Sequence, residues 1–271
     1  MGDNMSKSDM KLLFFDIDGT LITDDGTRTF PESAKEAIRL ARKNGHKTFI
    51  NTGRVMVNVE DFIREPGFDG YVCGCGTHIQ VNGEDIFHHT LSWERCNEIA
   101  HKCRDMGMMA IFEYISHTGY DQTIQGTAHR EILDYFIAMK RKLVRDIDGE
   151  DFVFDKFTAW YEEDNPYVEE FKEYLKDEFL VIQREGNFIE VVPKGFSKAT
   201  GIEYLAKYYD VSLDNIFVFG DSNNDLEMLQ YVPNSIAMGK CTKEVADISS
   251  YRTDTVENHG IYKAMKHFGV I

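Results

Sequence analysis

The chain has 271 residues and a formal net charge of −16, because 46 Asp and Glu residues outnumber 30 Lys and Arg residues. A charge excess of this size repels polyanions, which argues against a broad basic surface for nucleic acid or anionic membranes. Hydrophobic residues make up 42% of the chain and aromatic residues 13%, enough for a packed core and too much for a disordered chain. A chain of this length holds either one large domain or a core with a substantial insertion.

The amino-terminal segment does not have the pattern of a signal peptide or a membrane span. Residues 1–9 are largely polar and are expected to form a flexible leader, and no basic segment leads into a long apolar run. The odd count of 5 cysteines suits reduced thiols better than a disulfide framework. We therefore expect a cytoplasmic protein, a monomer or small homo-oligomer, with no nucleic-acid or membrane partner.

Two strands are predicted near the amino terminus, and each is followed by polar residues. Residues 11–16 form a short apolar run that ends in Asp16, the pattern of a buried strand whose carboxyl end opens into a loop. Apolar residues recur at helical spacing over 31–44, and residues 46–50 have the composition of a second strand. Such a strand–helix–strand unit brings Thr52, just after the second strand, towards Asp16.

The pattern changes in the middle of the chain, which predicts an inserted domain. Residues 82–187 lack the short buried strands and polar loops of the flanks, and favour an α+β cap with an antiparallel sheet. The parallel pattern then returns, with helices over 197–209, 222–230 and 260–268 and strands over 215–219 and 235–238. The predicted fold class is α/β, with a doubly wound parallel core over 1–81 and 188–271.

Acidic residues gather in two loops that are far apart in the sequence, Asp16-Ile17-Asp18 and Gly220 to Asp225. Each loop follows a predicted strand, so a parallel sheet would bring both loops to its carboxyl edge. Carboxylates held that close raise one another's pKa unless a cation neutralises them, and an all-oxygen set suits Mg²⁺. Either loop alone could be an ordinary turn rich in Asp, Asn and Gly. Both loops together, at strand ends, predict a magnesium site.

Four motifs occur in a fixed order along the chain: Asp16-Ile17-Asp18-Gly19-Thr20, Thr52-Gly53-Arg54, Lys198 in the segment 193–198, and Gly220 to Asp225. In this order they resemble the haloacid dehalogenase superfamily, and more narrowly its Cof-type phosphatases (subfamily IIB), which carry a large cap after the second motif. The resemblance spans nearly the whole chain. It implies a Rossmann-like core with the active site at the strand ends, in agreement with the predicted sheet.

The resemblance also implies a role for each matching residue. Asp16 would attack phosphorus and form an aspartyl-phosphate, and Asp18 would protonate the leaving alkoxide and later take a proton from water. Thr52 and Lys198 would complete the catalytic set. The implied phosphate-binding residues are Thr52, Gly53, Arg54 and Lys198. The implied Mg²⁺ ligands are Asp16, Asp18 through its main-chain carbonyl, Asp221, Asn224 and Asp225.

Several alternatives stay open at the level of sequence. A phosphomutase would keep the same motifs, because only the fate of the phosphoryl group differs. A silent metabolite or metal sensor could use the same scaffold, although its usual sign, a lost nucleophile or acid, is not found. Similar proteins act on phosphosugars and other small phosphorylated metabolites, so a phosphosugar-like substrate is expected. Cys75 stands where the Cof-type pattern usually has Asn, and Arg54 suits a structural salt bridge as well as a substrate contact.

Overall fold

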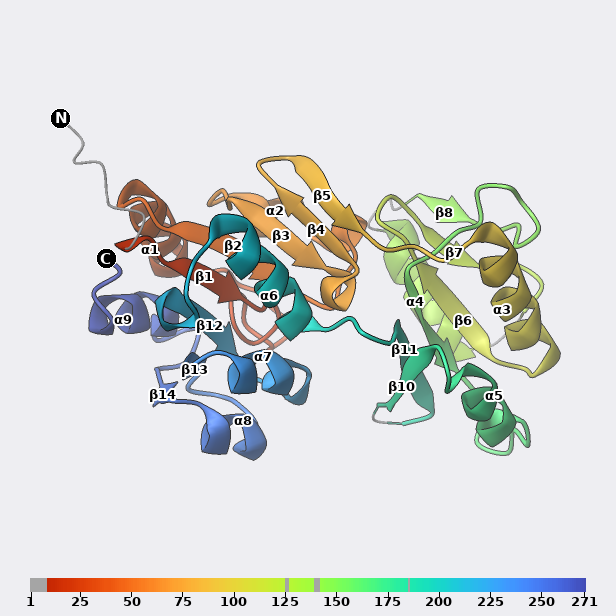
Figure 1. The fold of residues 1–271 in the computed structure, drawn as a ribbon. Helices are drawn as coiled ribbons and strands as arrows, with labels where there is room; N and C mark the ends of the chain where they lie inside the picture. Colours follow the sequence, from red (N-terminus) through yellow and green to blue (C-terminus); the bar gives the residue numbers. More distant parts are fainter. Residues whose placement is uncertain (1–8, 125–126, 139–141, 185) are drawn as a thin grey trace. The chain divides into compact units, whose positions relative to one another are not determined.

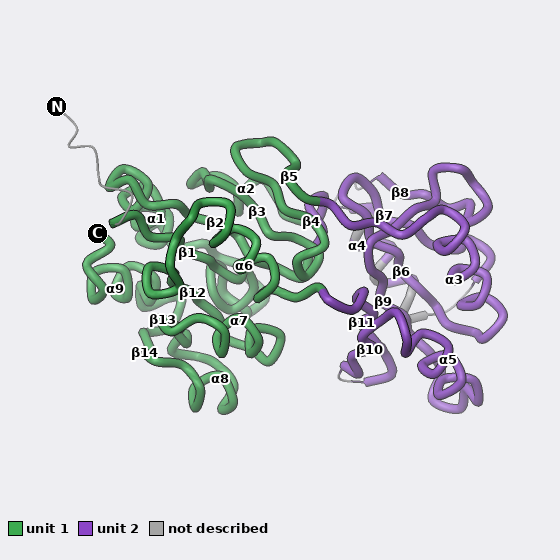
Figure 2. The backbone as a smooth tube through the Cα atoms, in the orientation of Figure 1, with its two compact units in different colours: residues 1–54, 59–87, 196–271 green, residues 55–58, 88–195 purple. Residues whose placement is uncertain are grey.

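The computed structural model (Figure 1) describes residues 9–124, 127–138, 142–184 and 186–271, so the predicted leader lies outside it except for Asp9. The chain divides into two compact units (Figure 2). Unit 1 comprises Met1–Arg54, Val59–Phe87 and Phe196–Ile271, and unit 2 comprises Val55–Asn58 and His88–Gly195. Each unit has a sheet of its own.

Unit 1 is built on an 8-stranded sheet in the order β14-β13-β12-β1-β2-β3-β4-β5. The strands from β14 to β3 are parallel, whereas β4 is antiparallel to β3. The strands of this sheet are β1 (Leu12–Phe15), β2 (Lys47–Asn51), β3 (Gly70–Cys73), β4 (His78–Val81), β5 (Glu84–His88), β12 (Ile216–Gly220), β13 (Asn234–Ala237) and β14 (Tyr251–Arg252).

Helices cover both faces of the unit 1 sheet. On one face, α6 (Lys198–Tyr209), α7 (Leu226–Tyr231) and α8 (Lys243–Ile248) share a hydrophobic cluster with Phe14 and Val218. On the other face, α1 (Glu32–Lys43) packs against α9 (Gly260–His267). Phe268, at the end of α9, meets the ring of Phe217, whose side chain points away from that of Val218. The remaining helix, α2 (Asp61–Arg64), is a single short turn. The predicted doubly wound α/β core is confirmed.

Local sequence accounts for the elements that matter most to the site. Every residue of β1 and of β12 is buried, as central parallel strands require. Helix α6 begins with a capping box: the Ser197 hydroxyl accepts from the Thr200 N–H, and the Thr200 hydroxyl accepts from the Ser197 N–H. This cap fixes where the helix starts, and therefore where its first residue, Lys198, is placed.

The boundaries of the inserted domain differ from the predicted positions, 82 and 187. Asn82 and Gly83 have φ angles of 51° and 86° and connect β4 to β5, as in a two-residue hairpin turn, so the chain leaves unit 1 only after Phe87. The strand β11 (Phe188–Pro193) pairs with unit 2 strands, so the chain returns only after Gly195. The short segment Val55–Asn58 was predicted as core but belongs to unit 2.

Unit 2 is built on a 6-stranded sheet in the order β10-β11-β9-β6-β7-β8, antiparallel except for the parallel pair β7 and β8. One sheet face packs against α3 and α5 through a cluster that includes Phe112, Phe157 and Phe171. Its elements are α3 (Trp93–Asp105), β6 (Met109–Glu113), β7 (Thr118–Tyr120), α4 (Thr127–Ala138), β8 (Leu143–Val144), β9 (Lys156–Trp160), α5 (Val168–Leu175), β10 (Phe179–Gln183) and β11.

Two further observations concern the environment of the chain. Among the described residues, no helix combines the length and the apolar character that crossing a membrane requires. All five cysteines lie in the described part of the chain, and none of them forms a disulfide.

Gly201 marks the closest approach of α6 to the sheet, because a Cβ at this position would lie 2.3 Å from Cγ1 of Val72. We expect Gly201→Ala to lower the free energy of unfolding by about 1–3 kcal/mol, since overpacking outweighs the roughly 1 kcal/mol that Ala gains in helix propensity. Urea unfolding measures this loss. In the double variant with Val72→Ala, the loss should be smaller than the sum of the single losses. A Gly201→Ala variant as stable as wild type would contradict the close approach.

Candidate active site

Polar side chains meet at the carboxyl ends of three neighbouring strands in unit 1. Asp16 follows β1, Thr52 follows β2 and Asp221 follows β12. These strands are parallel, with β1 between the other two, so their ends open on the same edge of the sheet. The fold therefore brings together loops that are far apart in the sequence, as the sheet prediction required.

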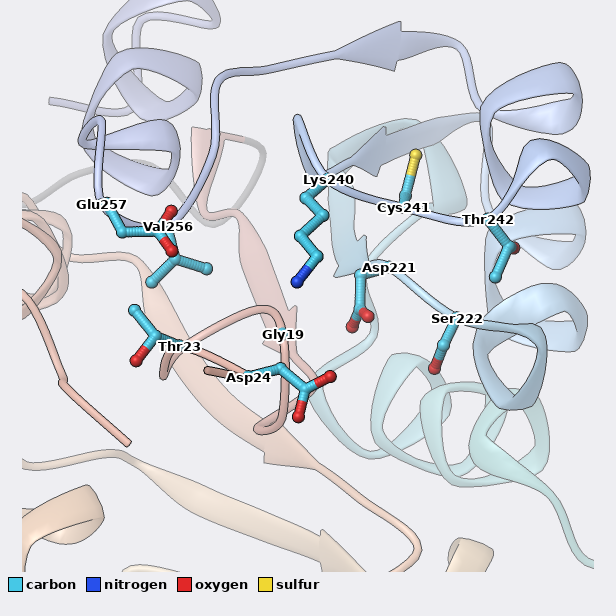
Figure 3. A pocket seen from close by; sticks show the side chains of 10 residues that line it. All are labelled: Gly19, Thr23, Asp24, Asp221, Ser222, Lys240, Cys241, Thr242, Val256 and Glu257. Carbon is cyan, nitrogen blue, oxygen red and sulfur yellow. The ribbon is translucent and has the colours of Figure 1, made fainter. Parts of the chain in front are cut away.

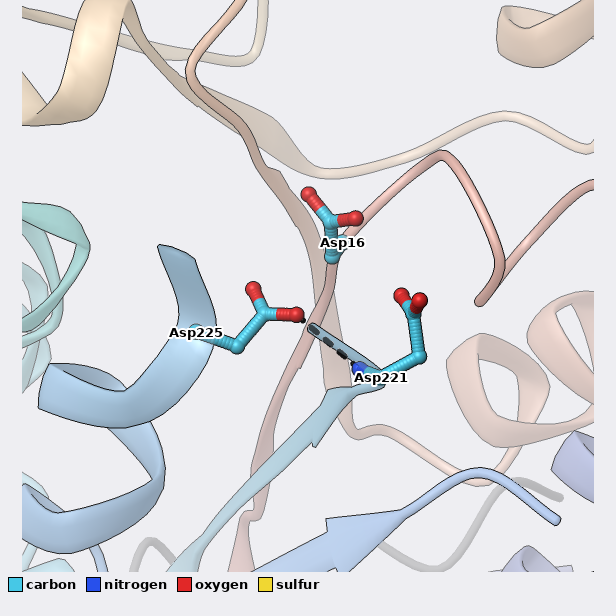
Figure 4. A group of neighbouring side chains, drawn as sticks. All are labelled: Asp16, Asp221 and Asp225. Atoms are coloured by element: carbon cyan, nitrogen blue, oxygen red, sulfur yellow. Dashed lines mark hydrogen bonds between the residues drawn. The ribbon is translucent and has the colours of Figure 1, made fainter. Parts of the chain in front are cut away.

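Three carboxylates form the centre of the site (Figure 4). Asp16, Asp221 and Asp225 each offer one oxygen, and these oxygens all lie within 4.8 Å of one another. Asp225 is fully buried, and its Oδ2 accepts from the N–H groups of Asp221 at 2.9 Å and Ser222 at 3.2 Å. These two bonds hold the loop after β12 against the start of the following helix. The result is a compact acidic cluster with oxygen donors only.

Lys198 supplies the positive charge of this cluster. Its ammonium donates to Oδ1 of Asp16 at 2.5 Å and to Oδ1 of Asp225 at 2.6 Å, and the side chain is almost completely buried. The ammonium offsets one of the three carboxylate charges when all are ionised. Two negative charges then remain, in a buried place where charge is costly.

The pKa values of the acids reflect this crowding. Burial, opposed by Lys198 and reinforced by Asp225, raises the pKa of Asp16 above its ordinary value. Burial, followed by the charges of Asp16 and Asp225, raises the pKa of Asp221 to about 8. The protein alone therefore resists full ionisation of the cluster.

Gly19 allows the Asp18 loop to approach Asp221. Its φ is 75°, and a Cβ at this position would lie 2.3 Å from Oδ2 of Asp221, so the backbone angle and the space both require glycine. The neighbouring Thr20 hydroxyl donates to Oδ1 of Asp221 at 3.1 Å. This close approach fixes the orientation of the Asp221 carboxylate.

Asp18 pairs with Arg54 and is not one of the three clustered carboxylates. The guanidinium of Arg54 donates from Nε to Oδ2 at 3.0 Å and from Nη2 to Oδ1 at 2.5 Å, a two-point contact. Its Nη1 donates to Glu60 at 2.7 Å, and Glu60 also pairs with Arg28 at 2.7 Å. Burial acts to raise the pKa of Glu60, but its bond to Arg28 and the charge of Arg54 hold it below the ordinary value. Glu60 is therefore an anion, and its carboxylate holds the Arg54 guanidinium in place.

Thr52 and Gly53 form the turn that leads to Arg54. Thr52 is buried, its N–H donates to the carbonyl of Val72 at 2.9 Å, and its hydroxyl accepts from the N–H of Arg54 at 3.1 Å. That bond uses the oxygen as an acceptor and leaves the hydroxyl hydrogen able to donate to a ligand.

The structure separates the expected site residues into groups. Asp16, Lys198, Asp221 and Asp225 come together in one cluster, whereas Asp18 pairs with Arg54. Asn224 is exposed, and its amide oxygen accepts from the Ser222 hydroxyl at 2.7 Å. Its assignment as a metal ligand stays a prediction.

Three residues that support the site had no predicted role: Thr20, Glu60 and Asn51. Thr20 lies within the first motif, so its position was a usable signal. Glu60 could not have been selected, because Asp61 stands beside it and Glu65 follows five residues later, and no local pattern separates the three. Asn51 donates from its amide to the main-chain carbonyl of Lys198, a contact between segments that no local pattern predicts.

A pocket of about 330 Å³ adjoins the site on the side of Gly19 and Asp221 (Figure 3). Asp24, Lys240 and Glu257 are among the residues that line it, and Figure 3 shows the Lys240 side chain extending into it. The Asp221 side chain therefore borders this pocket and also belongs to the acidic cluster.

Comparison with known proteins agrees with this geometry. The family model of the haloacid dehalogenase-like hydrolases matches residues 13–265. Among relatives, the 5-amino-6-(5-phospho-D-ribitylamino)uracil phosphatase YitU of Bacillus subtilis is 25% identical, over 95% of this chain and 97% of its own.

Two solved structures are also similar. A subclass IIB sugar phosphatase of the same superfamily is 29% identical with a TM-score of 0.77, covering 97% of this chain and 100% of its own. A phosphatase from Bacteroides thetaiotaomicron is 26% identical with a TM-score of 0.80, covering 100% of this chain and 99% of its own. The chain therefore belongs to the haloacid dehalogenase-like hydrolase family, as a phosphatase of the Cof type.

Proposed function

We propose that the protein is a Mg²⁺-dependent phosphatase that hydrolyses a small phosphorylated metabolite through an aspartyl-phosphate on Asp16. The observation that carries this proposal is the carboxylate of Asp16 at a strand end, bound to Lys198 and clustered with Asp221 and Asp225. A second carboxyl group, Asp18, follows two residues later. An acid of this kind is what a phosphate monoester needs when its alkoxide leaves.

The residues of the cluster fit Mg²⁺. The donors are all oxygens, the three carboxylates lie within 4.8 Å of one another, and one ammonium offsets only part of their charge. Asp16, Asp221 and the main-chain carbonyl of Asp18 would hold the ion, with Asp225 and Asn224 supporting them. When bound, the ion would stabilise negative charge on the phosphoryl oxygens.

In the first step, a carboxylate oxygen of Asp16 would form a bond to phosphorus while the bond from phosphorus to the ester oxygen breaks. The leaving oxygen would take the proton of Asp18. Thr52 would donate its hydroxyl hydrogen to a phosphoryl oxygen, and Lys198 would hold Asp16 in place. In the second step, water would attack phosphorus, pass a proton to Asp18 and release Asp16 and inorganic phosphate.

The contact between Arg54 and Asp18 gives Arg54 a part in this scheme. The planar guanidinium would hold the Asp18 carboxylate at two points until substrate enters, while Glu60 holds the other side of the guanidinium. This favours a structural and positioning role for Arg54 over the phosphate contact that the family resemblance implied.

The substrate class rests on the relatives. One relative is named for a phosphorylated ribitylamino compound and one solved structure for a sugar phosphatase, which supports a phosphosugar-like metabolite as the substrate here. Reduced cysteines at all five positions, each of them in the described part of the chain, suit the cytoplasm, where such metabolites occur. A screen of phosphorylated metabolites would identify the preferred leaving group.

Asp16→Asn tests the nucleophile. We expect phosphate release from a generic phosphate ester with Mg²⁺ to fall by about 10⁴-fold or more, because an amide cannot form the phosphoryl bond. Phosphate release, measured with and without Mg²⁺, checks this. In ¹⁸O-labelled water the wild-type protein should place the label in inorganic phosphate, whereas a phosphomutase would return the phosphoryl group to a substrate. No Mg²⁺-dependent turnover in the wild type would favour the sensor alternative.

Asp221→Asn tests the metal site without measuring turnover. The pKa of Asp221 is raised from 3.8 to about 8 on folding, so the folded state holds a proton that the unfolded state has lost between these pH values. The stability of the metal-free protein should therefore fall as the pH rises through this range. Mg²⁺ needs the ionised acids, so it should raise the melting temperature more near pH 8 than at about pH 6.

In Asp221→Asn, we expect a higher melting temperature than wild type near pH 8 without metal, and little or no increase with Mg²⁺. The matched control is Asp24→Asn, which removes an exposed carboxylate lining the adjoining pocket and should keep the Mg²⁺ response. An Asp221→Asn protein that keeps the full Mg²⁺ response would argue against this ligand.

Arg54→Lys tests the two-point contact with Asp18. Lysine keeps the charge but cannot bind both carboxylate oxygens in one plane, so we expect kcat/KM to fall by about 10- to 100-fold. Steady-state kinetics measures this change. Arg39→Lys, at an exposed arginine paired with Glu32 and Glu65, is the control and should leave kcat/KM unchanged. An Arg54→Lys variant with wild-type kcat/KM would contradict the proposed role of Arg54 in positioning Asp18.

A further inference from the structure

Asn51 is a fully buried amide between two of the sequence motifs. It is the last residue of β2, directly before Thr52, and its Nδ2 donates to the main-chain carbonyl of Lys198 at 3.0 Å. The sulfur of Met228 lies 3.5 Å from the same nitrogen. The side chain thus joins the end of a central strand to the first residue of α6.

Folding alone does not account for an amide at this position. Asn51 Oδ1 is buried and has no hydrogen-bond partner among the described residues. A buried acceptor of this kind destabilises the folded state, and an apolar side chain of similar size would avoid that cost. Residues that lower stability in this way are often retained for function.

The first turn of α6 is where a small displacement would matter most. Lys198 contacts Asp16 and Asp225 from the first position of the helix, so any shift of its main chain moves the ammonium relative to the nucleophile. The helix start is already confined on one side, because a Cβ on Gly76 would lie 2.5 Å from the Ser197 carbonyl oxygen. The Asn51 bond acts at the next residue along the chain.

We propose that Asn51 is a positioning residue, whose bond to the Lys198 carbonyl fixes the Lys198 ammonium against Asp16. The role rests on the proposed function, because it matters for turnover only if Asp16 is the nucleophile. A displacement of about 1 Å in such a group can lower turnover by about 100-fold. The bond runs from the Asn51 side chain, next to the second motif, to the main chain of Lys198 in the third, and it involves no atom of the substrate.

The test is Asn51→Leu, which has a similar volume and removes both the donor and the unpaired oxygen. We expect kcat for Mg²⁺-dependent phosphate release to fall by about 10- to 100-fold, with a smaller change in KM and with urea stability equal to wild type or higher. A kcat within two-fold of wild type in a folded Asn51→Leu protein would overturn the proposal.

The matched control is Asn234→Leu. Asn234 also donates its amide to main-chain carbonyls, those of Asp214 and Ile216, but it lies at the amino end of β13, away from the site edge of the sheet. This variant should lose stability and keep its kcat. Equal losses of kcat in the two leucine variants would show a general packing effect and would also overturn the proposal.

A measurement without turnover separates this proposal from the proposed function. The rate at which an amine-reactive reagent modifies Lys198, followed by peptide mass spectrometry, reports how firmly the buried ammonium is held. We expect modification at least about 10-fold faster in Asn51→Leu and unchanged in Asn234→Leu. If the wild type has no phosphatase activity, the proposed function fails while this rate still tests the Asn51 bond, and an unchanged rate in Asn51→Leu overturns it.

Discussion

The Lys198 ammonium, bound at once to Asp16 and Asp225, is the contact on which the rest of the site depends. It joins the end of β1, the start of α6 and the loop after β12, three segments that no covalent bond brings together. Removing one member of such a buried group leaves a charge without compensation, which costs about 3–5 kcal/mol. The capping box at Ser197, the close approach of α6 to the sheet at Gly201 and the Asn51 amide all keep this ammonium in place.

The acidic cluster lowers the stability of the folded protein, although it suits a binding site. Three acids share a buried space, and the pKa of Asp221 rises to about 8 because ionisation is disfavoured there. A fold selected for stability alone would replace such a cluster with apolar side chains. Such acids are expected in a binding site, where a bound ligand raises the free energy of unfolding that the cluster lowers. The free protein would then be less stable than the loaded one, and its stability would depend on the supply of the ligand.

Strand ends were predictable, whereas long-range partners were not. The apolar runs before Asp16 and Asp221 predicted two central strands, because buried parallel strands consist mostly of apolar residues. The Asn82-Gly83 pair is a hairpin signal, and the predicted boundary at 82 falls at this turn within unit 1. By contrast, the place of β11 depends on pairing with β9 and β10, and the Glu60 anchor depends on Arg28 and Arg54 meeting in space. Neither leaves a local pattern.

The segment Val55–Asn58 has a consequence for exchanging parts between related proteins. It belongs to unit 2, yet it is joined directly to Arg54 on one side and, through Val59, to Glu60 on the other. A chimera that transplants only residues 88–195 would therefore leave residues 55–58 of the old module in the host chain, between Arg54, which binds Asp18, and Glu60, which binds Arg54. Grafts that carry residues 55–58 with the new module should be more compatible with the host core. In this protein, the part to exchange therefore consists of two separate stretches of sequence, residues 55–58 and 88–195.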